Sequence, residues 1–120
     1  MDTREKIIPL SQAKAVLDNG IWTVIVGLFD PLTASQARRI ETYKRGGILV
    51  VVLENPDTLM PANARSHLVA ALRSVDFVAE ATEQEWHSVA VGNKNVEVID
   101  NLEEEKRRSQ DFIDLVASRQ

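Results

Sequence analysis

The chain contains no cysteine among its 120 residues, so disulfide bonds and thiolate chemistry are excluded. It also lacks an excess of basic residues, because 14 lysines and arginines stand against 18 aspartates and glutamates and no basic block occurs. We therefore expect neither nucleic acid nor an anionic membrane as a partner. No apolar run approaches the length of a membrane span, and the charged N-terminus does not resemble a signal peptide. The sequence predicts a cytoplasmic protein.

What the chain does contain is two short, strongly apolar runs, at 21–27 and at 48–53. Neither run alternates with polar residues, which predicts strands buried on both faces of a parallel sheet between helices. The segment between them opens with a capping signal and ends at Gly46-Gly47, so strand, helix and strand form one βαβ unit. The length suits a single α/β domain over residues 1–120.

Caps and periodicity predict the remaining elements. Ser11 is expected to cap the first helix, and residues 88–91 fit either a strand or apolar coil. The buried face of the third helix is expected to carry Leu68, Ala71, Leu72 and Val75. We expect helices at 11–18, 33–45, 62–74 and 101–118, a helical turn at 82–86, and strands at 21–27, 48–53, 76–79 and 96–99.

The turn that follows the first strand is the strongest candidate for a binding site. A buried strand that feeds a helix N-terminus is the arrangement that α/β folds use to hold anionic groups. Gly27 would let a phosphate or ribose approach the strand end, or only turn the chain sharply. Asp30 would hold a ribose hydroxyl or a substrate amine, or cap its own loop. Thr33 and Gln36 form a capping box, or donate hydrogen bonds to an anion.

Several stretches between residues 7 and 79 carry a family resemblance: Gly20, the turn Gly27-Leu28-Phe29-Asp30, Arg65 and the stretch 68–78. On these residues the chain resembles the cytidylyltransferase-like nucleotidyltransferases, in particular the adenylyltransferase domain of bifunctional heptose-phosphate kinase/adenylyltransferases. The resemblance implies a small Rossmann-like three-layer sandwich with a mainly parallel sheet and the first strand in its centre. It also implies transfer of a nucleoside monophosphate from ATP or CTP onto a phosphorylated small molecule, with release of pyrophosphate.

The chain departs from that family where catalysis is performed. The family signature His-x-Gly-His falls on Thr33-Ala34-Ser35-Gln36, so neither imidazole is present. The lysine-containing glycine-rich loop is reduced to 58–61. The Ser/Thr-rich turn of the last helix is replaced by the charged stretch 103–108, with Ser109 as the nearest hydroxyl. Removing one preorganised donor costs about a hundredfold to a thousandfold in rate. We therefore name no catalytic residue and interpret the chain as a degenerate, pseudoenzyme member.

The resemblance still implies a set of residues that bind a nucleotide or phosphate. Lys44 corresponds to a family base that faces the phosphates, although a cation near a helix C-terminus is favourable without any ligand. Arg65 is the best-matched charged position and the expected phosphate contact, against the alternative of a first-turn arginine that packs its stem. Phe29 fits a core position or pocket wall better than a stacking platform. The expected binding residues are Gly27, Phe29, Asp30, Thr33, Gln36, Lys44 and Arg65.

Three functions stay open at this point. The first is a module that binds a nucleotide or small phosphorylated molecule without efficient catalysis. The second is an active nucleotidyltransferase, acting on a sugar or polyol phosphate, in which Thr33, Gln36 and Arg65 hold the phosphates together with Mg²⁺. The third is a structural or homodimerising domain, suggested by the thin apolar face of the last helix. We expect no protein-held metal, because His67 and His87 stand apart from any acidic cluster at ligand spacing.

Overall fold

The computed structural model describes residues 3–43, 46–89, 96–102, 105 and 107. Four strands form one sheet: β1 (Trp22–Gly27), β2 (Gly47–Leu53), β3 (Phe77–Ala81) and β4 (Val96–Asp100). Their order is β3-β2-β1-β4, and all three neighbouring pairs run parallel. The prediction of a Rossmann-like parallel α/β fold is therefore confirmed.

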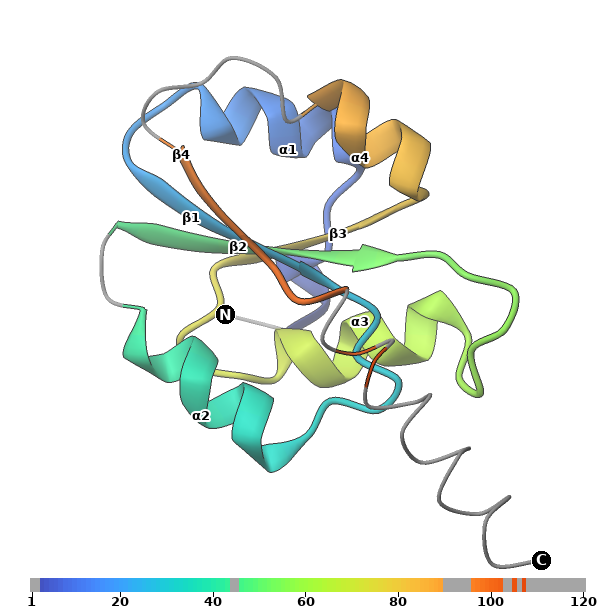
Figure 1. The fold of residues 1–120 in the computed structure, drawn as a ribbon. Coiled ribbons are helices and arrows are strands. Elements are labelled where there is room, and N and C mark those ends of the chain that lie inside the picture. The colour runs from blue at the N-terminus through green and yellow to red at the C-terminus, as the bar shows by residue number, and fades with distance from the viewer. Residues whose placement is uncertain (1–2, 44–45, 90–95, 103–104, 106, 108–120) are drawn as a thin grey trace, which may run out of the picture.

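The helices cover the sheet in two layers, so the fold is a three-layer sandwich (Figure 1). One face carries α1 (Leu10–Leu17) and α4 (Glu83–Val89), whereas the other carries α2 (Ala34–Thr42) and α3 (Ala62–Ala70). A short 3₁₀ helix, η1 (Thr3–Lys6), precedes them. Among the described residues, no helix is long and apolar enough to cross a bilayer.

The two central strands supply both halves of the core. In β1, Val24 and Val26 pack toward α1 and α4, while the intervening Ile25 packs toward α2 and α3. The same alternation in β2 sends Leu49, Val51 and Leu53 to the first face and Ile48, Val50 and Val52 to the second. Because both faces are covered, both positions of the two-residue period must be apolar, which explains the unbroken runs in the sequence.

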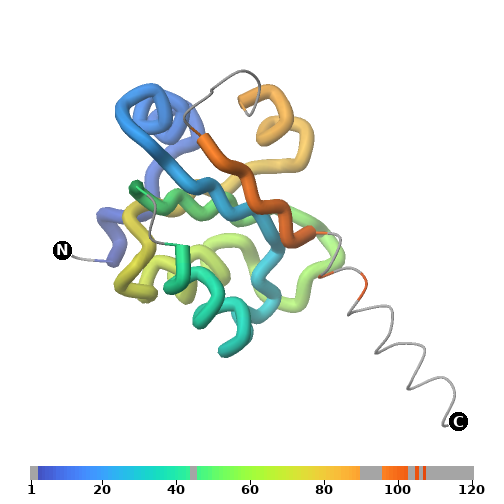
Figure 2. The backbone as a smooth tube through the Cα atoms, turned by 60° about the vertical axis from the view of Figure 1, so that its left-hand side comes forward, coloured from blue at the N-terminus to red at the C-terminus, as the bar shows by residue number. Residues whose placement is uncertain are grey.

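The edges of the sheet are less apolar than its centre. β4 pairs with β1 over Trp22–Val26 and has an exposed outer surface on which Val98 is 44% accessible. Figure 2 shows β1 and β4 side by side, with β4 at the margin of the sheet. This pairing matters for function because it delivers the segment after β4 to the carboxyl end of β1.

Several predicted boundaries are wrong by a few residues. The first helix is capped by Pro9 and starts at Leu10, so Ser11 lies inside it and is not its N-cap. The second helix ends at Thr42, three residues before its expected end. β3 continues to Ala81, and α4 runs to Val89, so residues 88 and 89 are helical and not strand. Residues 90–95 and most of the expected last helix lie outside the described residues.

The third helix differs from the prediction in its buried face. It ends at Ala70 and not at residue 74, and it buries Arg65, Ser66, Val69 and Ala70. Leu68, which was expected in the core, is 44% exposed, and Ala71 is exposed as well. The helix is rotated relative to the expected orientation because the side chain of Arg65 turns inward to backbone carbonyl groups, as described below.

Candidate functional site

Two consecutive backbone amides at the carboxyl end of β1 hold a carboxylate. Phe29 N donates to Glu105 Oε2 at 2.8 Å, and Leu28 N lies 3.1 Å from both Glu105 oxygens. Both N–H groups point to the same side of the chain, since they donate to one carboxylate. Phe29 itself has a positive φ of 52°. Successive N–H groups that converge in this way form an anion-binding concavity. We call the N–H groups of Leu28 and Phe29, with the open space at Gly27, the amide cradle.

Gly27 is what lets the carboxylate enter the amide cradle. A Cβ built on Gly27 would lie 2.2 Å from Glu105 Oε1 and 3.1 Å from the nearest atom of the Phe29 ring. Any other residue would therefore displace the carboxylate or the ring. The geometry displays close approach of the Glu105 carboxylate to the strand end, and approach of a phosphate or ribose at Gly27 stays a prediction.

The topology of the sheet explains how a distant residue reaches this position. Asn101 N donates to Val26 O at 2.8 Å, which extends the β1–β4 pairing beyond the strand. Leu102 and Glu105 are helical, and Glu105 N donates to Asn101 O at 3.0 Å. One helical turn after the end of β4 thus places the side chain at position 105 over the carboxyl end of β1.

Arg65 supports the amide cradle from the opposite side. Its side chain is 1% exposed, and Nη1 donates to Leu28 O at 2.6 Å and to Leu53 O at 2.8 Å. Nε donates to Met60 O at 3.0 Å. Arg65 therefore joins the ends of β1 and β2 to the following loop. No described residue gives this guanidinium a carboxylate within ion-pair distance.

The peptide group between Leu28 and Phe29 connects the two charges. Its carbonyl oxygen accepts from Arg65, and its N–H donates to Glu105. In a trans peptide these two groups point in opposite directions, so the cation lies on one side and the anion on the other. Hydrogen bonds in such a chain polarise one another, and the buried guanidinium makes the amide a better donor to an anion. The amide cradle is thus electropositive, although the described residues place no cationic side chain in it.

The side chain of Asp30 binds backbone N–H groups of a neighbouring loop. Its carboxylate accepts from Leu59 N at 2.6 Å and from Met60 N at 2.9 Å. The carboxylate binds a loop other than its own, because it ties the β1–α2 turn to the loop between β2 and α3. Asp30 and Arg65 both fix that loop, since Arg65 also binds the carbonyl of Met60.

Thr33 and Gln36 form the predicted capping box. Gln36 N donates to Thr33 Oγ1 at 3.1 Å, and Thr33 N donates to Gln36 Oε1 at 3.0 Å. The Phe29 side chain is fully buried in the core against α2 and α3, so this residue offers its backbone N–H to the site and not its ring. Lys44 lies outside the described residues.

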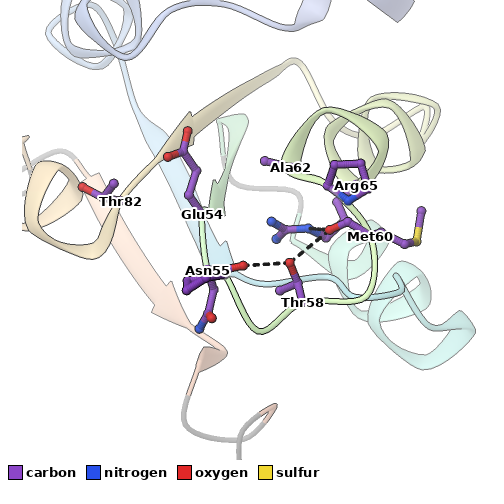
Figure 3. A pocket seen from close by; sticks show the side chains of 9 residues that line it. Glu54, Asn55, Thr58, Met60, Ala62, Arg65 and Thr82 are labelled. Carbon is purple, nitrogen blue, oxygen red and sulfur yellow. Dashed lines mark hydrogen bonds between the residues drawn. The ribbon is translucent and has the colours of Figure 1, made fainter.

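A cavity of about 580 Å³ opens beside Arg65 at the carboxyl ends of β2 and β3 (Figure 3). The guanidinium of Arg65 projects toward this cavity, and no described residue accepts from its Nη2. The Thr58 hydroxyl is engaged with Asn55 O at 2.8 Å and Met60 O at 3.0 Å. The cavity is lined by Glu54, Asn55, Pro56, Thr58, Met60, Pro61, Ala62, Arg65 and Thr82.

Thr82 and Glu85 yield a pH-dependent prediction at the rim of this cavity. Thr82 N donates to Glu85 Oε1 at 2.9 Å, and this bond, followed by that of the Thr82 hydroxyl, lowers the pKa of Glu85 below its ordinary 4.5. Because the folded pKa is lowered, the stabilisation is complete above the unfolded pKa and is lost as the pH falls through the folded value. We expect a carboxyl NMR titration to give a Glu85 midpoint below 4.5. A midpoint at or above that value would contradict the bond.

The described residues contain no group of three or more histidine, aspartate or glutamate side chains placed to hold a metal ion. His67 and His87 are both exposed, on different helices. The site therefore consists of backbone amides, one buried arginine and the carboxylate of Glu105.

Glu105 is the site residue that sequence reasoning missed, because an acidic residue in the expected first turn of a helix is ordinarily explained by the helix dipole. The available signal was topological: a strand that pairs with β1 is followed, one turn later, by a carboxylate facing the glycine that ends β1. Comparison of the chain with protein-family profiles, with curated proteins and with solved structures finds no significant match in any of the three.

Proposed function

We propose that this protein binds a phosphorylated small molecule, with a nucleotide as the first candidate, at the carboxyl end of β1. The observation that carries the proposal is the amide cradle, in which two consecutive N–H groups already hold an anionic group. Carboxylate and phosphate oxygens accept the same charge-assisted hydrogen bonds from backbone amides. The position also favours a ligand, because open α/β sheets bind ligands outside the carboxyl ends of their strands.

The charge beneath the amide cradle supports an anionic ligand over a neutral one. Arg65 is buried, is bonded to three carbonyl oxygens and has no described carboxylate partner. An anion in the amide cradle therefore compensates a buried positive charge across a single peptide group. The cavity of about 580 Å³ lies on the Arg65 side of this peptide group, and none of its lining residues belongs to the amide cradle.

We further propose that binding occurs without efficient nucleotidyl transfer. Thr33 and Gln36 satisfy each other and the start of α2, and Arg65 has committed Nε and Nη1 to carbonyl groups. Charge that develops on a transferring phosphoryl group needs preorganised donors or cations at the reacting atoms. Thr33 and Gln36 would have to leave their present partners to supply them, and Arg65 has only Nη2 without a described acceptor. The active-transferase alternative is therefore the weaker of the two.

Thermal unfolding with a ligand panel tests the proposal. The panel contains ATP, CTP and sugar phosphates, each with and without Mg²⁺, and adenosine as the control that lacks phosphate. A ligand at a hundred times its dissociation constant stabilises the fold by about 2.7 kcal/mol, which corresponds to a shift of several degrees. We expect a shift with at least one phosphorylated compound, none with adenosine, and no pyrophosphate release. No shift at millimolar ligand would overturn the binding function and favour the structural domain.

A further inference from the structure

We infer that Glu105 is an internal competitor for the phosphate group of the ligand, so that the site is closed by the chain itself. This inference rests on the proposed function, because it concerns the regulation of the same amide cradle. The carboxylate takes up both N–H groups, at 2.8 Å from Phe29 N and 3.1 Å from Leu28 N. A phosphate that used the same donors would have to displace it.

The carboxylate of Glu105 fits closely into the amide cradle. Glu105 Oε1 occupies the space that the missing side chain of Gly27 leaves, 2.2 Å from where a Cβ would lie. The backbone of the same segment is anchored by Asn101 N on Val26 O at 2.8 Å and by Leu102 N on Asp100 Oδ1 at 2.8 Å. The carboxylate is thus delivered by fixed backbone contacts that do not themselves involve the amide cradle.

Because of these anchors, the Glu105 carboxylate can leave the amide cradle while β4 stays in place. Asn101 is 6% exposed and stays paired with β1, whereas Glu105 lies one turn further on and is only partly buried. Rotation of the Glu105 side chain would free the N–H groups of Leu28 and Phe29 without breaking the pairing of β4 with β1. Arg65 would then face whichever anion is bound, because its contact with Leu28 O is independent of Glu105.

The expected change in ligand affinity depends on how often Glu105 occupies the amide cradle. The apparent dissociation constant equals the intrinsic one divided by the fraction of molecules whose site is open. If Glu105 occupies the amide cradle about nine-tenths of the time, its removal strengthens binding about tenfold. The competition also predicts that Glu105 and a bound phosphate never contact the two N–H groups together.

The test compares Glu105→Ala with the wild type and with Glu97→Ala, a control that removes an exposed glutamate on β4. The probes are inorganic phosphate, which contains the bonding group alone, and ATP. Binding is followed by calorimetry and by the amide NMR signals of Leu28 and Phe29. We expect Glu105→Ala to bind at least about tenfold more tightly than the wild type, Glu97→Ala to match the wild type, and both amide signals to shift.

The outcomes separate this inference from the proposed function. Equal affinity of wild type and Glu105→Ala, with the amide signals shifting in both, would overturn the competition and leave the binding function intact. Absence of binding in both the wild type and Glu105→Ala would overturn the competition and the proposed binding function together. Tighter binding that leaves the Leu28 and Phe29 signals unchanged would place the ligand elsewhere and also overturn the competition.

A second variant covers the case in which Glu105→Ala does not fold. Glu105→Gln retains one acceptor oxygen for the amide cradle and removes the negative charge. We expect it to fold and to bind phosphate with an affinity between those of the wild type and an open site. An affinity equal to that of the wild type would contradict the role of the carboxylate.

Discussion

Arg65→Met is expected to destabilise the protein by about 3–5 kcal/mol, because three backbone carbonyl groups lose a charged hydrogen-bond donor. The carbonyl oxygens of Leu28 and Leu53 lose the donor described above, whereas Met60 O keeps the hydroxyl of Thr58. Each buried acceptor that loses its partner costs about 1–3 kcal/mol. Methionine keeps the length and apolar stem of the side chain, so the loss reports the guanidinium and not a cavity.

Chemical denaturation at neutral pH measures the change in the free energy of unfolding. Thermal denaturation is expected to show a midpoint about 10–20 °C lower for a domain of this size. Arg73→Met is the matched control, because Arg73 is exposed and follows the same helix. The free energy of unfolding of Arg65→Lys should lie between those of Arg65→Met and Arg73→Met, since one ammonium nitrogen cannot reproduce the several donors of the guanidinium. If Arg65→Met and Arg73→Met were equally stable, Arg65 would not organise this edge of the sheet.

Gly27→Ala is expected to destabilise the fold by about 1–3 kcal/mol, the usual cost of adding a methyl group to a filled space. In a strand interior the same change ordinarily stabilises a protein by about 0.5–1 kcal/mol, because glycine loses the most backbone entropy on folding. The sign is reversed here because the new Cβ would lie 2.2 Å from Glu105 Oε1 and 3.1 Å from the Phe29 ring.

A double-mutant cycle with Glu105→Ala identifies the atom responsible. With the carboxylate removed, the next nearest contacts are those with the Phe29 ring, at 3.1 and 3.2 Å. We therefore expect Gly27→Ala to cost at least about 1 kcal/mol less in the Glu105→Ala background than in the wild type, a coupling typical of residues in contact. An identical cost in both backgrounds would show that Gly27 and Glu105 do not interact.

The fold was predictable because its strongest signals are local. The apolar runs at 21–27 and 48–53 can be satisfied only by strands covered on both faces, and both are central strands of the parallel sheet. The capping box of Thr33 and Gln36 requires residues three positions apart, and it forms as expected. The family resemblance, in contrast, stays a prediction, and the function drawn from it is a proposal.

The face of α3 was not predictable from hydropathy. Hydropathy places Leu68 in the core, yet Leu68 is 44% exposed, and Arg65, which was expected to contact a phosphate or to pack its stem, is 1% exposed. Carbonyl groups at the ends of β1 and β2 leave acceptors that helices and strands do not satisfy, and a guanidinium with several donors meets them. That requirement arises only once the two strands lie side by side, so no local pattern in α3 contains it.

The occupant of the amide cradle was equally hidden, because Leu28 and Glu105 are 77 positions apart in the chain. Acidic residues at a helix start are ordinarily explained by the helix dipole, and that explanation was sufficient for 103–105. Only the position of β4 beside β1 brings position 105 to Gly27. Close approach at Gly27 was one of two roles that the sequence left open, and a carboxylate of the chain itself was not among the expected groups.

The placement of Glu105 above the amide cradle also has an evolutionary consequence. A single nucleotide change in a glutamate codon can yield alanine, glutamine or lysine, and none of these would alter Gly27, Phe29 or Arg65. The structural framework of the site, which is built from backbone groups and one buried side chain, would survive such a change. Under the proposed competition, one point mutation at position 105 would convert a site occupied by a carboxylate into a vacant one. Selection could therefore gain or lose the proposed ligand binding while the fold stays the same.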